Sequence, residues 1–127
     1  MIDSIMNKQQ YEAWVIKADE TLQHSNLFKD HARQEIYRSY NGYVAALGVS
    51  VLMTGLIPTL AIYYQDNDGV CRKNVLEVIA EMVGENSARQ LMETVLRSPQ
   101  RRKELQKKVV ESSIALKQVV RTYKLVD

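Results

Sequence analysis

The 127-residue sequence has little of the material that builds disulfide-rich, disordered or secreted proteins. Its one cysteine, Cys71, excludes an internal disulfide and a cysteine-based zinc site. Two prolines and five glycines leave little room for disordered tails. The first 25 residues carry six charged side chains and no long apolar run, which argues against a secretory signal peptide. We therefore expect a cytoplasmic protein in a reducing compartment.

Residues that carry familiar catalytic chemistry are also scarce. The chain has two histidines, His24 and His31, and no HExxH, GxSxG, Walker or GxGxxG pattern. The run DNDG at 66–69 resembles the start of a calcium loop, but Arg72 and Lys73 lie inside that loop, where ligands are required. We therefore expect a protein that binds rather than catalyses, with no metal, no cofactor and no small-molecule substrate.

Length and periodicity predict the fold class. A chain of this size usually builds one core, so we expect a single domain over residues 1–127. Apolar residues recur at helical spacing and almost never alternate, which predicts an all-α fold without strands, a compact bundle of five to seven helices. The expected helices cover residues 5–23, 27–40, 43–54, a short stretch around Pro58, 74–83, 87–96 and a long closing segment from Pro99 to about Tyr123.

One segment fits a second interpretation. Residues 39–65 hold no charged side chain, and about 20 apolar residues suffice to cross a bilayer. Gly55 and Pro58 interrupt this stretch, and three hydroxyl side chains dilute it. We favour a central hairpin in a water-soluble core and expect no membrane partner, and we keep the membrane span as the alternative.

Charge divides the chain into two parts. Residues 1–70 hold five Lys/Arg and eight Asp/Glu, whereas residues 71–127 hold twelve and seven. In the closing helix the apolar residues form one stripe (Leu105, Val109, Leu116, Val120 and Tyr123), and basic residues lie on the opposite side (Lys103, Lys107, Lys117, Arg121 and Lys124). A basic face of this kind suits an anionic partner, although a solvated helix surface has the same composition.

The densest charge lies at the start of that helix, in RSPQRRKELQKK at 97–108. Side chains like these meet phosphates through charge alone and need no particular base sequence. The candidate RNA-binding residues are Arg97, Arg101, Arg102, Lys103, Lys107, Lys108, Lys117, Arg121 and Lys124. Val110 and Ile114 lie inside the basic stripe, and either a contact with a neighbouring subunit or a second core contact would explain them.

The stretch VSVLMTGLIPTLAIYYQ adds a family resemblance. Its GL-x-x-TLA core and aromatic tail resemble the central signature of the small helical subunit of type III-B CRISPR effectors, the Cmr complex. The tyrosine-rich segment upstream, the loop after Tyr64 and the closing LKQVVRTYKL also look like that family, from about residue 10 to 125. The family often has a proline and an asparagine before the Gly-Leu pair, whereas this chain has Leu52, Met53 and Thr54 there and its proline at Pro58.

The resemblance implies a non-catalytic helical subunit of an antiviral ribonucleoprotein complex. Its expected partners are other CRISPR effector subunits, copies of itself that stack along the complex, and the backbone of guide RNA and target RNA. The alternative function is a helical protein–protein adaptor that makes no contact with nucleic acid.

Overall fold

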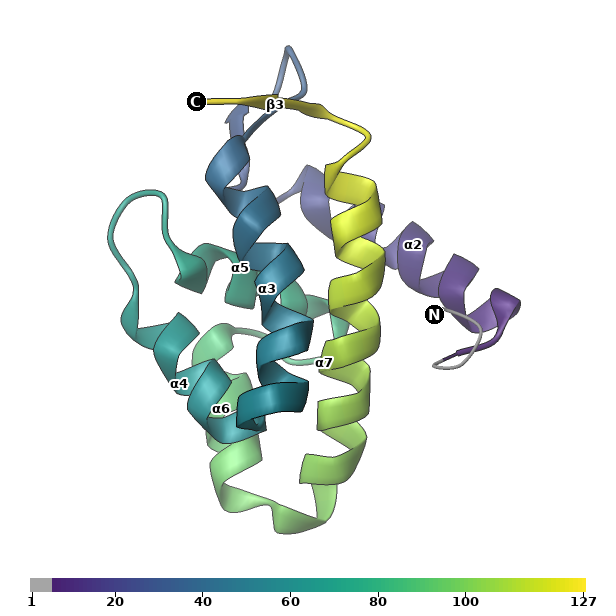
Figure 1. Cartoon of the computed structure of the whole chain (residues 1–127), viewed down its shortest axis with the longest axis vertical. Helices are drawn as coiled ribbons and strands as arrows, with labels where there is room; N and C mark the ends of the chain where they lie inside the picture. The colour runs from purple at the N-terminus through teal and green to yellow at the C-terminus, as the bar shows by residue number, and fades with distance from the viewer. Residues whose placement is uncertain (1–5) are drawn as a thin grey trace.

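A computed structural model describes residues 6–127 (Figure 1). Six helices carry this part of the chain, so the all-α prediction is confirmed. The elements, in chain order, are α2 (Lys8–Gln23), β1 (Phe28–Asp30), β2 (Glu35–Tyr37), α3 (Arg38–Thr54), α4 (Leu56–Gln65), α5 (Arg72–Met82), α6 (Ala88–Arg97), α7 (Pro99–Val120) and β3 (Lys124–Val126).

Local capping chemistry starts three of the helices, two of them where the sequence predicts it. Asn7 caps α2 in a reciprocal capping box with Gln10, although the expected start of this helix at residue 5 lies outside the described residues. Ser87 caps α6, since its hydroxyl accepts the Gln90 backbone N–H. Pro99 occupies the first turn of α7, where its missing N–H costs nothing.

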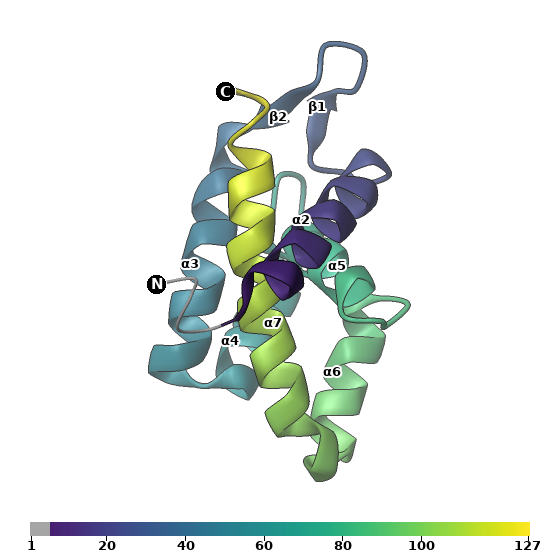
Figure 2. The same ribbon diagram turned by 90° about the vertical axis from the view of Figure 1, so that its right-hand side faces the viewer.

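Helix α7 is the axis of the bundle. Helix α3 runs along one side of it and α2 crosses it on another, as the two views together show (Figures 1 and 2). Because neighbours cover it from several directions, the second half of α7 is buried almost all round, with Leu116 and Val120 fully inaccessible. The side chains of α5 and α6 complete the same core.

A sharp corner joins α3 to α4. Gly55 forms this corner with a φ of +112°, a conformation that side chains other than glycine rarely adopt. Leu56, Thr59 and Leu60 follow and are buried, so the GL-x-x-TLA core is a packing motif. Pro58 lies in the first turn of α4, as predicted.

The expectation of a chain without strands, with a helix over 27–40, is wrong. Residues 28–37 form a hairpin with a turn at Gln34, whose φ is +54°. The last strand, β3, pairs in parallel with β2 and makes a three-stranded sheet of order β1-β2-β3. The third strand lies about 90 residues away in the chain. Local periodicity cannot detect such a partner.

Two expected boundaries also move. Asn41 and Gly42 do not form a turn, because α3 already begins at Arg38 and includes both. Helix α7 ends at Val120, so Tyr123 follows the helix instead of closing its stripe. Tyr123 still packs against the core, with its ring edge-on to Phe28 at 5.4 Å between centroids.

The membrane alternative depends on one long apolar helix. The corner at Gly55 divides the uncharged stretch into α3 and α4. Among residues 6–127, no helix has the length and apolar character that a membrane crossing requires.

Candidate nucleic-acid interface

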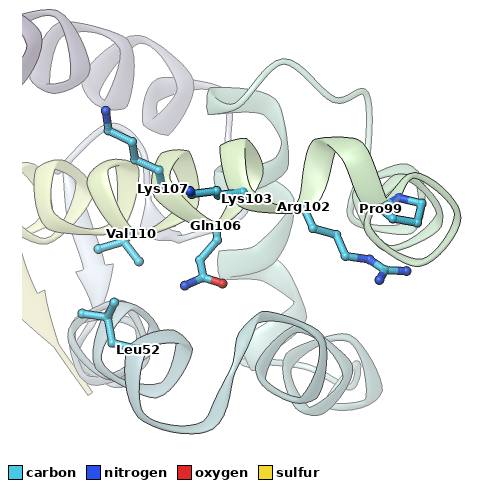
Figure 3. A pocket seen from close by; sticks show the side chains of 7 residues that line it. All are labelled: Leu52, Pro99, Arg102, Lys103, Gln106, Lys107 and Val110. Carbon is cyan, nitrogen blue, oxygen red and sulfur yellow. The ribbon is translucent and has the colours of Figure 1, made fainter.

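Three residues of the predicted basic stripe, Lys103, Lys107 and Lys117, line a groove between α3 and α7, here called the α3–α7 groove. Arg121 and Lys124 follow the end of α7 at Val120 and line neither of its cavities, so the stripe is shorter than predicted. A cavity of about 570 Å³ forms its wider end, where the first turns of α7 face the end of α3 (Figure 3). A second cavity of about 200 Å³ continues it along both helices. Leu52 and Val110 line both cavities and point toward one another across the groove (Figure 3).

A close approach of the two helices sets the floor of this groove. Gly48 of α3 is buried against α7, and a Cβ atom there would lie 2.6 Å from the Ser113 hydroxyl oxygen. Ser113 in turn donates to the Val110 carbonyl at 2.7 Å. The missing side chain at Gly48 therefore allows the backbones to approach and brings the basic face of α7 beside α3.

Three of the nine candidate cations have no ion pair or hydrogen bond within residues 6–127. Lys103 is exposed near the start of α7, Lys117 is half-buried farther along the groove, and Arg97 is exposed at the end of α6. Lys107 is almost as free, because its ammonium is 4.0 Å from the Glu111 carboxylate and 65% of its side chain is exposed. Lys103, Lys107 and Lys117 all line the groove, so their charges are available to an anion there.

The remaining cations are partly occupied. Arg102 donates to the Val95 carbonyl at 2.6 Å and the Leu96 carbonyl at 2.9 Å, which closes the last turn of α6. Arg101 lies 3.5 Å from the Glu85 carboxylate. Both arginines thus have structural partners that a phosphate would have to share or displace.

A lysine and a glutamate pair at the first half of α7. The Lys108 ammonium lies 2.8 Å from the Glu104 carboxylate, and this hydrogen bond lowers the pKa of the Glu104 carboxyl. At the far end, Arg121 donates to the Asn41 side chain at 3.3 Å, and Lys124 lies 3.6 Å from Glu35. Of the nine candidate cations, the ones most available to a ligand are therefore those that line the groove.

Val110 and Ile114 lie within the groove wall. Val110 is buried and belongs to the core cluster, and Ile114 is half-buried against the same core. The core contact accounts for Val110 without any partner. Contact of either residue with another subunit stays a prediction.

An apolar patch on α3, which the sequence does not indicate, borders the groove. Val49, Leu52 and Met53 are 61%, 64% and 82% exposed. Their spacing places them on one face of α3, but the whole segment is uncharged, so the pattern could not tell the exposed side from the buried one. Exposed apolar patches are typical of interaction surfaces.

The described part of the chain was also searched for side chains that could bind a metal ion. No group of three or more His, Cys, Asp or Glu side chains comes together there in a way that could hold a metal ion. Asp66, the first residue of the calcium-like run, accepts the Arg72 backbone N–H at 2.9 Å and lies 3.1 Å from its guanidinium. This carboxylate thus caps the start of α5.

Both the sequence and the fold are similar to those of known proteins. The model of a family of CRISPR-associated proteins (Cas_Cmr5) matches residues 16–123. The fold is similar to the crystal structure of a CRISPR-associated Cmr5 family protein from Thermus thermophilus, with a TM-score of 0.70 and 20% sequence identity over 94% of this chain and 99% of that one. No curated protein matches the sequence.

Proposed function

Since the chain belongs to the Cas_Cmr5 family of CRISPR-associated proteins, we propose that it is a non-catalytic small subunit of a type III-B CRISPR effector complex. In this role it touches the backbone of guide and target RNA and stacks with copies of itself. The family match, which spans 108 of the 127 residues, carries the subunit assignment. The three lysines of the α3–α7 groove support the RNA contact.

The RNA contact follows from charge and geometry. Lys103, Lys107 and Lys117 lie on one face of α7 and line one continuous groove. Flexible ammonium groups beside a groove suit phosphates of any sequence, since they act as point charges. A subunit that must accept many different guide sequences requires such sequence-tolerant contacts.

A salt titration tests this contact. Binding of a fluorescently labelled single-stranded RNA of unrelated sequence is measured by anisotropy at several salt concentrations. Lys103→Ala should weaken binding and lower the slope of log affinity against log salt by about 0.7. The matched control is Lys8→Ala, which removes another exposed lysine from the start of another helix. Equal slopes for both variants, or no RNA binding by the wild type, would contradict the proposal.

Stacking of copies requires two complementary faces, because a head-to-tail contact joins different surfaces. One face is the α3 patch beside the groove lysines. Another is the exposed face of α2, where Ile16 is 60% exposed between Glu12 and Glu20, one turn away on either side. An apolar side chain flanked by acids complements an apolar patch flanked by lysines.

Reversing the charges on the two faces tests whether they contact each other in a stack. Glu12→Lys and Glu20→Lys together should reduce concentration-dependent self-association in sedimentation velocity. Adding Lys103→Glu and Lys107→Glu to the same chain should restore part of it. If the second pair of changes weakens association further, these faces do not meet.

The α3 patch also favours a second function, a protein–protein adaptor. Val49, Leu52 and Met53 expose apolar surface that RNA phosphates do not cover. Met53→Ser changes a patch residue that lines neither cavity of the groove and adds no charge. It should then weaken binding to other effector subunits in a co-purification and leave the RNA salt slope unchanged. A protein that acts only as an adaptor would lose subunit binding in this variant, and the wild type would not retard RNA in a gel-shift assay at moderate salt.

A further inference from the structure

A separate cavity lies on another side of α7, where α2 crosses it (Figure 2). Its volume is about 280 Å³, and Gln10, Ala13, Trp14, Lys17 and Glu111 line it. None of these residues lines the α3–α7 groove. The cavity, here called the α2–α7 cavity, has no role in the fold beyond the contact of the two helices.

A buried carboxylate fixes the aromatic wall of this cavity. Glu111 is 5% exposed, and its Oε1 accepts the indole N–H of Trp14 at 3.1 Å. This bond holds the N–H edge of the ring against α7, while the half-buried side chain of Trp14 lines the cavity. Glu111 Oε2 has no hydrogen-bond partner within residues 6–127. That oxygen is itself buried, and the Lys107 ammonium 4.0 Å away balances its charge, so the role of Glu111 at this site is to position Trp14.

The charges around the cavity select the kind of ligand. Lys17 lines it, and the Lys107 ammonium lies 4.0 Å from Glu111 Oε2. Two ammonium groups beside one carboxylate leave a net positive surrounding, which disfavours a cationic side chain and favours a polyanion. The flat indole favours a polyanion that carries planar rings. Single-stranded RNA combines both properties, whereas an acidic peptide supplies only the charge.

The cavity also adjoins the candidate RNA interface. Lys107 lines the α3–α7 groove (Figure 3), and its ammonium lies 4.0 Å from Glu111, which lines the α2–α7 cavity. A strand whose phosphates follow Lys103 and Lys107 therefore passes the mouth of the cavity.

We propose that the α2–α7 cavity receives one unstacked base of single-stranded RNA, which stacks on Trp14 while Lys17 and Lys107 meet the neighbouring phosphates. This site rests on the proposed RNA contact and extends it from the backbone to a base. No base preference follows, since stacking tolerates every base.

The intrinsic fluorescence of the protein monitors this site without a label, because Trp14 is its only tryptophan. Single-stranded oligoribonucleotide is titrated into the wild-type protein, and tryptophan fluorescence is recorded together with the anisotropy of a label on the RNA. N-acetyl-tryptophanamide in the same titration corrects for absorption by the RNA. We expect quenching that saturates at the same RNA concentration as the anisotropy, and no quenching by inorganic polyphosphate, which has charge without bases.

Variants of the cavity test the stack and the charge separately. Trp14→Ala should lower the affinity for RNA on the order of tenfold, the size of one base–aromatic stack, and Trp14→Phe should keep most of it. Lys17→Ala should lower the salt slope by about 0.7, whereas Lys8→Ala on the same helix should leave it unchanged. Circular dichroism checks that each variant is folded. If Trp14→Ala is unfolded, the quenching of the wild type and the slope of Lys17→Ala decide.

Each outcome has a distinct meaning. A rise in anisotropy with unchanged tryptophan fluorescence would overturn the base site and leave the proposed RNA contact standing. No rise in anisotropy at low salt would remove the proposed RNA contact and the base site with it. Quenching by polyphosphate or polyglutamate as strong as quenching by RNA would also overturn the base site, because it would indicate a site for charge alone.

Discussion

The two halves of α7 belong to one helix and have opposite surroundings. In residues 99–108 only Leu105 is buried, whereas nine of the twelve residues in 109–120 are buried. Helices α2 and α3 flank the second half, so even Glu111, Ser112 and Ser113 lie inside. Burial in a helix thus depends on how many neighbours it has, and an amphipathic stripe describes it only where one neighbour covers one face.

This difference in burial assigns binding and stability to different parts of α7. The first half presents lysines to solvent beside the α3–α7 groove, and the second half holds the bundle together. Changes in the second half should therefore reduce the free energy of unfolding, and changes in the first half should reduce binding. The following predictions run from the largest expected effect on stability to the smallest.

The largest loss is expected at Leu116, in the middle of the buried half. Its side chain is fully inaccessible, so Leu116→Ala should lower the free energy of unfolding by about 2–5 kcal/mol through lost burial and a new cavity. Urea denaturation followed by circular dichroism measures this. The control is Leu96→Ala, which removes the same atoms from a side chain that is 51% exposed. Equal losses at both positions would break the distinction between buried and exposed sites.

An intermediate loss is expected where α3 touches the buried half. Gly48→Ala places a methyl group 2.6 Å from the Ser113 hydroxyl, which must rotate and give up its bond to Val110, at a cost of about 1–3 kcal/mol. Removing that hydroxyl with Ser113→Ala in the same chain should restore part of the stability, which a double-mutant cycle quantifies.

Gly42→Ala is the matched control for that cycle. Gly42 lies in the same helix, and a Cβ atom there would meet nothing within 4 Å. Alanine should then stabilise the protein by about 0.5–1 kcal/mol through its helix propensity. A destabilising Gly42→Ala would show that the cost at Gly48 comes from the backbone of α3 and not from the contact with α7.

A smaller effect, confined to alkaline pH, is expected at Tyr123, just beyond the buried half. Burial raises the pKa of Tyr123 to about 12, and its hydrogen bond to the Asp19 carboxylate adds to the shift. The unfolded chain releases this proton near pH 10, earlier than the folded protein, so the contribution of Tyr123 to stability should be complete well below pH 10 and should be lost as the pH rises toward 12. Denaturation at about pH 9 and about pH 11 measures the fall, and Tyr123→Phe should make it shallower. A steeper fall in that variant would contradict this assignment.

The smallest effect on stability is expected in the exposed half. Lys103→Ala should change the free energy of unfolding by less than about 0.5 kcal/mol, because this exposed side chain has no ion pair among residues 6–127 and alanine favours helix. Lys107 is kept, because it is the ion-pair partner of the buried Glu111. The Lys103 variant should lower the RNA salt slope by about 0.7, the value of one phosphate contact. A stability loss as large as that of Leu116→Ala would mean that the first half of α7 also belongs to the core.

Sequence reasoning worked best where the signal was local. The helix starts at Ser87 and Pro99, the loop after Gln65 and the helix around Pro58 all depend on residues within one turn of each other. The family resemblance was carried by a similar short stretch, and that stretch contains the corner at Gly55 and the buried side chains that follow it.

The same reasoning failed where a distant segment decided the conformation. Ile36 became the centre of a strand because Phe28 and Leu125 lie opposite it on either side, and one of these partners comes from the end of the chain. Likewise, nothing near Trp14 in the sequence indicates Glu111, which is 97 residues away and holds its indole. The α2–α7 cavity was therefore invisible before the helices were packed together.

By itself, the sequence determined that this protein is helical, where most of its helices begin and end, and which residues of α7 are basic. Capping, turn chemistry and helical periodicity act over a few residues, so they can be seen in the chain alone. Tertiary structure decided which of the candidate cations remain free. It brought Glu85 and Glu35 beside two of them and left Lys103 and Lys117 without a partner among the described residues, because ion pairing depends on distance in space and salt screens it beyond about 8–10 Å.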